Sequence, residues 1–186
     1  MGKSTLGVYV HVPFCVQKCS YCDFLSFDNL PQVEDDYFKV LYRELMFSLK
    51  RLASSYEIDS IFIGGGTPTV VDPKYIEELF DLFARFGNMS EDAEVTIEAN
   101  PETLSRQKLK AYESCGINRI SLGVQSFDHK ELDTLGRFYT KDQPQKALDL
   151  IASGNIDNII FQDCKIPAWY KYLLASFNSA DYYFVL

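Results

Sequence analysis

Three cysteines stand close together near the start of the chain, in the segment Cys15-Val16-Gln17-Lys18-Cys19-Ser20-Tyr21-Cys22. Thiolates ligate the irons of four-iron clusters, normally with one thiolate for each iron. Three thiolates from one loop therefore leave one iron with an open position, and an open position on a metal is where a further ligand binds. The positive charge of Lys18 within this segment favours the thiolate form of its neighbours.

A zinc site is the competing interpretation of the same cysteines. Structural zinc takes four ligands in a closed geometry, usually from paired C-x-x-C motifs or from cysteines with histidines. The chain has only two histidines, His11 and His129, and its other cysteines, Cys115 and Cys164, lie far along the sequence. The spacing thus favours a cluster with an open iron, while a non-catalytic metal-binding fragment stays as an alternative.

The sequence around the loop alternates between strand and helix patterns. Strands are expected at residues 6–12, 59–63, 94–99, 119–123 and 158–161, and helices at 35–53, 73–86, 103–114, 128–136 and 140–154. Asp128 with Glu131, and Thr140 with Gln143, form capping-box patterns at the starts of the last two helices. This alternation predicts an α/β fold with a parallel sheet, outer helices and sites at the carboxyl ends of the strands.

Residues able to bind a polar ligand follow several of these strands. The glycines of Gly64-Gly65-Gly66-Thr67-Pro68 allow the backbone to approach a ligand closely. The carboxylate of Glu98, the amide of Gln125 and the planar guanidinium of Arg137 suit hydroxyl, ammonium and carboxylate groups. Taken alone, these residues also fit a tight turn, a surface ion pair, a capping amide and a solvated arginine.

The bulk composition limits the classes of function. A chain of 186 residues that is 47% apolar suits one folded domain. A formal net charge of −8 makes nucleic acid a poor partner. We see no run long enough to be a transmembrane segment and no secretory signal, so we expect a cytoplasmic protein.

Beyond the cysteines, the chain resembles radical SAM proteins of the oxygen-independent coproporphyrinogen oxidase group over roughly residues 6–160. The motifs that carry the resemblance are Tyr9-Val10-His11-Val12-Pro13-Phe14-Cys15, Tyr21-Cys22-Asp23-Phe24, Gly64-Gly65-Gly66-Thr67-Pro68, Glu98-Ala99-Asn100-Pro101, Gly123-Val124-Gln125-Ser126-Phe127 and Leu135-Gly136-Arg137. They occur in the order and at the spacing of that group.

The resemblance implies that residues 1–160 form the first part of a radical SAM (β/α) barrel. In such proteins Cys15, Cys19 and Cys22 would hold a [4Fe-4S] cluster, and S-adenosylmethionine would chelate the open iron through its amino and carboxylate groups. An electron from the cluster then cleaves the sulfonium bond and gives a 5′-deoxyadenosyl radical. The resemblance assigns no catalytic side chain, and it assigns the following residues to the S-adenosylmethionine pocket: Tyr9, Tyr21, Gly64, Gly65, Gly66, Thr67, Glu98, Gln125 and Arg137. Phe14 and Phe24 are expected to keep water from the cluster.

Two departures distinguish between branches of the group. The coproporphyrinogen oxidases carry another cysteine where this chain has Phe24, and they have a longer region before the position of Tyr9. Both departures favour the heme chaperone branch, which implies heme, a heme-acceptor protein and an electron donor such as flavodoxin or ferredoxin as partners. Coproporphyrinogen oxidation in porphyrin biosynthesis stays as the alternative, so whether the chain is an enzyme is left open.

Residues 161–186 depart from the family. Gln162 stands where the group has an aspartate for the adenosine end, and the segment that follows is densely aromatic. We therefore expect a divergent tail and a barrel incomplete at its C-terminal side. A disrupted reading frame, which would impair turnover, is favoured over a deliberately short homologue.

Overall fold

The computed structural model describes residues 4–19, 21–28, 30–137, 142–156 and 158–161, and its main feature is a parallel five-stranded sheet. The strands run in the order β1 (Ser4–Val12), β4 (Tyr56–Gly65), β5 (Met89–Ala99), β6 (Arg119–Leu122) and β7 (Asn158–Phe161). Two short parallel strands, β2 (Phe14–Cys15) and β3 (Phe27–Asp28), form a separate ribbon.

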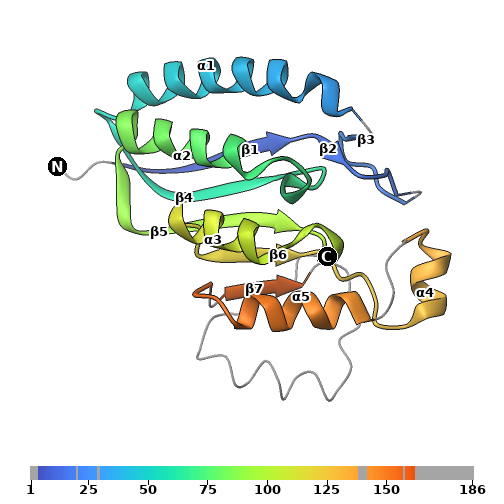
Figure 1. Cartoon of the computed structure of the whole chain (residues 1–186). Coiled ribbons are helices and arrows are strands. Elements are labelled where there is room, and N and C mark those ends of the chain that lie inside the picture. The colour runs from blue at the N-terminus through green and yellow to red at the C-terminus, as the bar shows by residue number, and fades with distance from the viewer. Residues whose placement is uncertain (1–3, 20, 29, 138–141, 157, 162–186) are drawn as a thin grey trace.

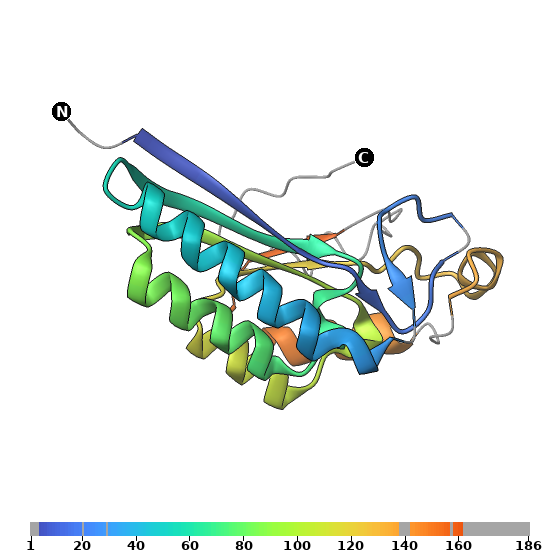
Figure 2. The same ribbon diagram turned by 90° about the horizontal axis from the view of Figure 1, so that it is seen from above.

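Helices alternate with these strands along the chain. They are α1 (Glu34–Leu52), α2 (Pro73–Phe86), α3 (Arg106–Ser114), α4 (His129–Thr134) and α5 (Asp142–Ala152), with 3₁₀ turns η1 (Pro31–Val33), η2 (Pro68–Val70) and η3 (Pro101–Thr103). The long helices cover one face of the sheet, and α4 lies with the β2–β3 ribbon beyond the arrowheads of the strands (Figures 1 and 2). The carboxyl ends of the strands thus meet at one edge, as the alternation predicts.

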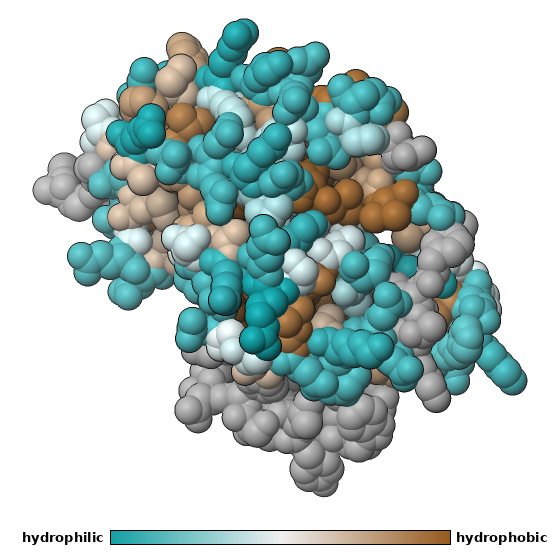
Figure 3. All heavy atoms as spheres, in the orientation of Figure 1, coloured by the Kyte–Doolittle hydropathy of each residue, from teal (hydrophilic) through white to brown (hydrophobic). Residues whose placement is uncertain are grey.

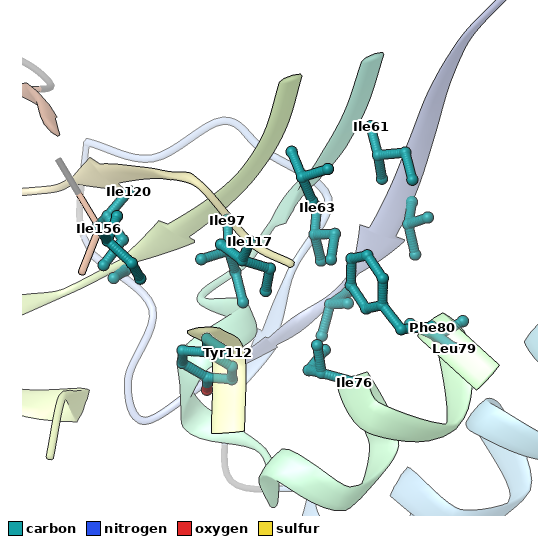
Figure 4. Close-up of a cluster of buried hydrophobic side chains, with 14 of the residues drawn as sticks. Ile61, Ile63, Ile76, Leu79, Phe80, Ile97, Tyr112, Ile117, Ile120 and Ile156 are labelled. Atoms are coloured by element: carbon teal, nitrogen blue, oxygen red, sulfur yellow. The ribbon is translucent and has the colours of Figure 1, made fainter. Parts of the chain in front are cut away.

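The hydrophobic core lies between the sheet and the helices. Ile63, Ile97 and Ile120 point from neighbouring strands toward Ile76 of α2 and Tyr112 of α3, and all five side chains are buried (Figure 4). Each aliphatic side chain of this size stabilises the fold by about 1.5–3 kcal/mol when it is buried. The outer surface seen in Figure 3 is mostly hydrophilic, with scattered hydrophobic patches, as expected for helices that bury only one side.

The first two helices are joined through aromatic side chains. The ring of Phe38 on α1 stacks on that of Tyr75 on α2, with centroids 4.3 Å apart. Phe38 also stacks on Phe14, which directly precedes Cys15. The buried layer therefore supports the residue next to the first cysteine.

The α/β architecture and the parallel sheet with helices expected from the sequence are confirmed, with local differences at element ends. The third helix begins at Arg106 and not at residue 103, because Pro101–Thr103 forms a 3₁₀ turn capped by Asn100. β5 begins at Met89, several residues before the expected start. No helix within the described residues is long and apolar enough to cross a membrane.

The capping-box prediction for α4 is half right. The carboxylate of Asp128 accepts hydrogen bonds from the backbone amides of Lys130 and Glu131, as predicted. The carboxylate of Glu131 accepts from the hydroxyl of Ser126 at 2.5 Å, and that hydroxyl oxygen accepts from the amide of Asp128. Ser126 thus takes the place in the box that the pattern gave to Glu131. The other predicted box begins at Thr140, outside the described residues.

Candidate functional site

The cysteine loop leaves the carboxyl end of β1 and folds back on itself. The amide of Phe27 donates to the carbonyl of Pro13 at 2.7 Å, and the amide of Cys22 donates to the carbonyl of Cys19 at 3.1 Å. The thiols of Cys15, Cys19 and Cys22 are free and half-buried. Burial raises the pKa of Cys15 above its ordinary value, and hydrogen bonding by Ser26 and Thr67 acts in the opposite direction.

One cavity at this end of the sheet brings the predicted site residues together. All three cysteines line it, and so do all of the residues predicted for the nucleoside pocket except Tyr9 and Gly64. The predicted pocket residues that line it are Tyr21, Gly65, Gly66, Thr67, Glu98, Gln125 and Arg137. Residues that are more than a hundred positions apart in the sequence therefore share one site.

The backbone amides of the glycine-rich loop bond within the protein. Gly65 donates to Oε2 of Glu98 at 3.0 Å, Gly66 donates to the carbonyl of Val12 at 2.9 Å, and Thr67 donates to the carbonyl of Phe14 at 2.7 Å. These bonds attach the loop to β5 and to the start of the cysteine loop. These three donors are therefore not available to a ligand at this loop.

Two glycines of the loop are required by its geometry. Gly65 has a φ of +122°, which side-chain-bearing residues rarely adopt. A Cβ atom on Gly66 would lie 2.6 Å from the carbonyl oxygen of Phe14 and 2.9 Å from Sγ of Cys15. The loop thus approaches the first cysteine more closely than any larger residue allows.

Thr67 connects the glycine-rich loop to Cys15 and to Asn100, the residue that follows β5. Its hydroxyl donates to Sγ of Cys15 at 3.9 Å and accepts from Nδ2 of Asn100 at 3.0 Å. Our sequence prediction omitted Asn100, although it follows Glu98 in a quoted motif at a strand end. Gln17 and Ser26 also line the cavity and were not predicted, since neither has a distinctive spacing.

Gln125 has an unusual backbone conformation. Its φ is +64°, the only positive value of a non-glycine residue in the described part of the chain, and its side chain is buried. Such a conformation costs on the order of 1–3 kcal/mol and occurs mainly where a site requires it. The turn after β6 is therefore held in a strained form beside the cavity.

Arg137 and Tyr21 contact each other across the cavity mouth. Nε of Arg137 donates to the hydroxyl of Tyr21 at 3.0 Å, and the guanidinium carbon lies 5.8 Å from the ring centroid. Burial raises the pKa of Tyr21 to about 12, while the arginine charge acts in the opposite direction. The pair therefore keeps a neutral phenol beside a fixed positive charge.

Tyr9 and Gly64 lie next to the cavity without lining it. Tyr9 stacks on Phe62, and its hydroxyl is 3.0 Å from Nδ1 of His11. Burial, and then the charge of Glu98, raise the pKa of Tyr9. A Cβ atom on Gly64 would lie 2.9 Å from Oε2 of Glu98, so this glycine makes room for the carboxylate.

The two phenylalanines expected to exclude water differ in position. Phe14 is buried in the core, whereas the side chain of Phe24 is 69% exposed at the rim of the cavity. Phe24 lines the cavity from an irregular loop, so its exclusion of water from the cluster stays a prediction.

Comparison with known proteins agrees with this geometry. The family model of the Radical SAM superfamily matches residues 9–165. The chain belongs to the radical SAM superfamily. Its curated relatives include the heme chaperone HemW of Escherichia coli, 41% identical over 80% of this chain and 39% of the relative, and that of Haemophilus influenzae, 39% identical over 82% and 42%. The chain therefore spans about two fifths of the length of these relatives.

Solved structures point to the same superfamily. The coproporphyrinogen III oxidase HemN of Escherichia coli, described as a radical SAM enzyme, superposes with a TM-score of 0.75 at 25% identity, over 86% of this chain and 37% of that one. The maturase HydG of the [FeFe]-hydrogenase superposes with a TM-score of 0.55 at 13% identity, which supports the fold alone.

Membership of the radical SAM superfamily implies a [4Fe-4S] cluster and S-adenosylmethionine as cofactors, and the residues present fit both. No group of three His, Cys, Asp or Glu side chains within the described ranges is placed to hold one metal ion. The three thiols nevertheless line a common cavity, which suits a cluster that takes one thiolate at each of three corners. The adjoining carboxylate, amide and guanidinium suit the polar groups of an amino acid attached to a nucleoside.

Proposed function

We propose that this chain is the cluster- and S-adenosylmethionine-binding part of a heme chaperone. The observation that carries the proposal is the shared cavity, in which the cysteines meet Glu98, Gln125 and Arg137. The identity of about two fifths to the HemW chaperones supports the choice of branch. In this proposal the partners are heme, a heme-acceptor protein and an electron donor such as flavodoxin or ferredoxin, in the cytoplasm, where thiols stay reduced.

Each residue then has a role that follows from its chemistry. Cys15, Cys19 and Cys22 hold three irons, and the carbonyls of the Gly64–Thr67 loop accept hydrogen bonds from an ammonium group. Arg137 binds the carboxylate of the same amino acid, and Tyr21 holds the guanidinium in place. Glu98 and Gln125 bind ribose hydroxyls. The bound cofactors supply one-electron cleavage of a carbon–sulfur bond.

Coproporphyrinogen oxidation is the second candidate, favoured by the superposition on HemN. The phenylalanine at position 24 disfavours this second candidate, because the oxidases carry a cysteine at this position. The two functions differ in a direct measurement: a chaperone binds heme, seen as a Soret band after heme addition, whereas an oxidase consumes coproporphyrinogen with S-adenosylmethionine and an electron donor. We expect heme binding without porphyrinogen consumption.

The cofactor assignment has its own test. Anaerobic reconstitution with iron and sulfide should load the chain, and electron paramagnetic resonance of the reduced protein should change when S-adenosylmethionine is added. Cys19→Ser should lose the signal, whereas Cys115→Ser at the end of α3 should keep it, since burial raises the pKa of Cys115 to about 11 far from the cavity. Uptake of zinc but not of iron would select the non-catalytic metal-binding fragment.

A further inference from the structure

Thr67 is a buried residue whose hydroxyl lies between a side-chain amide and a cysteine sulfur. The residue is only 5% exposed, and it lines the cavity that the three thiols share. Its hydroxyl oxygen lies 3.0 Å from Nδ2 of Asn100 and 3.9 Å from Sγ of Cys15. The hydroxyl therefore has one nitrogen and one sulfur as hydrogen-bond partners.

The chemistry of these two partners fixes the direction of both hydrogen bonds. An amide NH₂ group is a donor and not an acceptor, so Nδ2 of Asn100 donates to the Thr67 oxygen. The Thr67 hydroxyl keeps its own single proton, and it donates that proton to the sulfur of Cys15. Asn100 thus directs the hydroxyl proton of Thr67 toward Cys15.

Asn100 is itself held in place by two further hydroxyls. Its backbone amide donates to Oγ1 of Thr103 at 3.3 Å, and Thr103 donates its proton to the carbonyl of Asn100 at 2.8 Å. Because that proton is already used, the hydroxyl of Thr69 is the donor in its 2.5 Å contact with Thr103. Thr69 is fully buried in the turn that follows Thr67. The turn after Asn100 is therefore fixed to the turn after Thr67.

The glycine-rich loop approaches Cys15 closely and presents this one hydroxyl to it. The backbone amides of Gly65, Gly66 and Thr67 donate to other groups of the protein. A Cβ atom on Gly66 would lie 2.9 Å from Sγ of Cys15, so the loop lies against the sulfur at this residue. The donor that the loop offers to the sulfur is therefore the side chain of Thr67.

We propose that Thr67 and Asn100 set the reduction potential of the cluster: Asn100 orients the Thr67 hydroxyl, and that hydroxyl donates to the sulfur of Cys15. The inference rests on the proposed function and goes beyond it, because it assigns the Thr67 hydroxyl to the cluster and makes Asn100 a positioning residue. One-electron reduction makes the cluster and its ligand sulfurs more negative, and a hydrogen bond to a sulfur stabilises that state. The pair therefore raises the reduction potential.

The first test measures the midpoint potential of the reconstituted full chain, by redox titration followed with electron paramagnetic resonance. S-adenosylmethionine is left out, so that a contact between it and Thr67 makes no contribution. Thr67→Val keeps the branched shape without the hydroxyl, and its potential should be more negative than that of the original chain. Thr67→Ser keeps the hydroxyl and should keep the potential. Thr96→Val is the control with an unchanged potential, since it removes an equally buried hydroxyl that donates to Glu94 at 3.2 Å.

Asn100→Asp tests the direction of the bonds. The change replaces the amide donor by a carboxylate of the same shape, which accepts the Thr67 proton and withdraws it from the sulfur. The added negative charge lowers the potential as well, so the same change is also made in Thr67→Val, where the charge acts alone. Asn100→Asp should therefore lower the potential more in the original chain than in Thr67→Val.

Each outcome supports or overturns the inference. A potential of Thr67→Val equal to that of the original chain overturns it, and so does an Asn100→Asp shift of the same size in both chains. If Thr67→Val folds by circular dichroism but takes up no cluster, Asn100→Asp in the original chain decides, and an unshifted potential there overturns the inference. An original chain that takes up no iron and sulfide overturns the proposed function and this inference with it, whereas unshifted potentials in a loaded chain overturn the inference alone.

Discussion

Nε of Arg137 lies 3.0 Å from the hydroxyl of Tyr21, although 116 positions separate them in the sequence. Tyr21 stands between two of the cysteines, and Arg137 follows α4. Under the proposed function, this contact links the loop that would hold the cluster to the residue that would bind the amino-acid carboxylate.

Arg137→Met is expected to weaken the binding of S-adenosylmethionine to the reconstituted protein by roughly ten- to a hundred-fold, the loss expected for a charged hydrogen-bond partner. Tyr21→Phe keeps the guanidinium and removes one of its hydrogen-bond acceptors, so the loss of affinity for S-adenosylmethionine should be smaller, about two- to ten-fold. Anaerobic titration calorimetry measures both. Arg85→Met is the matched control, since Arg85 is exposed on α2 and pairs only weakly with Asp81 at 3.9 Å. Unchanged affinity in Arg137→Met would remove this arginine from the pocket.

Gly66→Ala should prevent cluster loading, because the new Cβ would meet the Phe14 carbonyl and the Cys15 sulfur. We expect iron content to fall sharply and the free energy of unfolding to drop by about 1–3 kcal/mol, as for other overpacked sites. Gly116→Ala is the control: it has a φ of +84° but nothing within 4 Å of a new Cβ, so it should cost about 1 kcal/mol and leave iron content unchanged. Full iron loading in Gly66→Ala would show that the loop can move away.

Tyr75→Phe should lower stability in a manner that depends on pH. The hydroxyl of Tyr75 donates to Oδ1 of Asp35 at 2.5 Å, and this bond, helped by the charge of Lys74, holds the pKa of Asp35 below its ordinary 3.8. A carboxyl with a lowered pKa binds fewer protons in the folded state, so its stabilisation is complete above about pH 4 and is lost as the pH falls through the folded pKa.

Urea unfolding of the original chain and of Tyr75→Phe between pH 7 and pH 3 measures this effect. The difference in unfolding free energy should be constant near neutral pH and should shrink in the acid range. Tyr37→Phe removes a hydroxyl that donates to a backbone carbonyl, that of His11, so its difference should not vary with pH. A Tyr75→Phe difference that stays constant down to pH 3 would contradict the assignment.

Tyr112→Phe is expected to stabilise the protein. The side chain of Tyr112 is fully buried, and its hydroxyl has no hydrogen-bond partner among the described residues. An unsatisfied buried hydroxyl costs about 1–3 kcal/mol, so its removal should raise the free energy of unfolding by about 1 kcal/mol in a urea titration. Tyr42→Phe should do the opposite, because the hydroxyl of Tyr42 donates to the carbonyl of Tyr75 at 3.0 Å. A loss of stability in Tyr112→Phe would reveal a partner for the hydroxyl.

Hydrophobic periodicity predicted the order of helices and strands well, because these elements bury their apolar side chains in one core. In the strand at residues 94–99, the core side chains of Val95, Ile97 and Ala99 alternate with polar residues, and this alternation is visible in the sequence. The start of α3 was misplaced because Asn100 begins a 3₁₀ turn, in which the amide of Asn100 donates to Oγ1 of Thr103. An asparagine before a proline is also compatible with a helix cap. The local sequence pattern does not distinguish a 3₁₀ turn from the start of an α-helix.

The site was predictable where spacing or motif marked a residue, and unpredictable where only tertiary contacts do. The cysteines, Glu98 and Arg137 occur in recognisable motifs. Ser26 has no such mark, and its place in the cavity depends on the fold of the whole loop. The strained backbone of Gln125 is likewise invisible in the sequence, since its neighbours rather than its own preference impose it.

The glycine-rich loop has a consequence for the choice of ligand. Phosphate-binding loops coordinate oxyanions with free backbone amides, but Gly65, Gly66 and Thr67 donate theirs to Glu98, Val12 and Phe14. A loop whose amides are engaged in this way lacks the donors that hold an oxyanion. ATP carries the same adenosine as S-adenosylmethionine with a triphosphate in place of the methionine, and this loop would offer the phosphates none of these three amide donors.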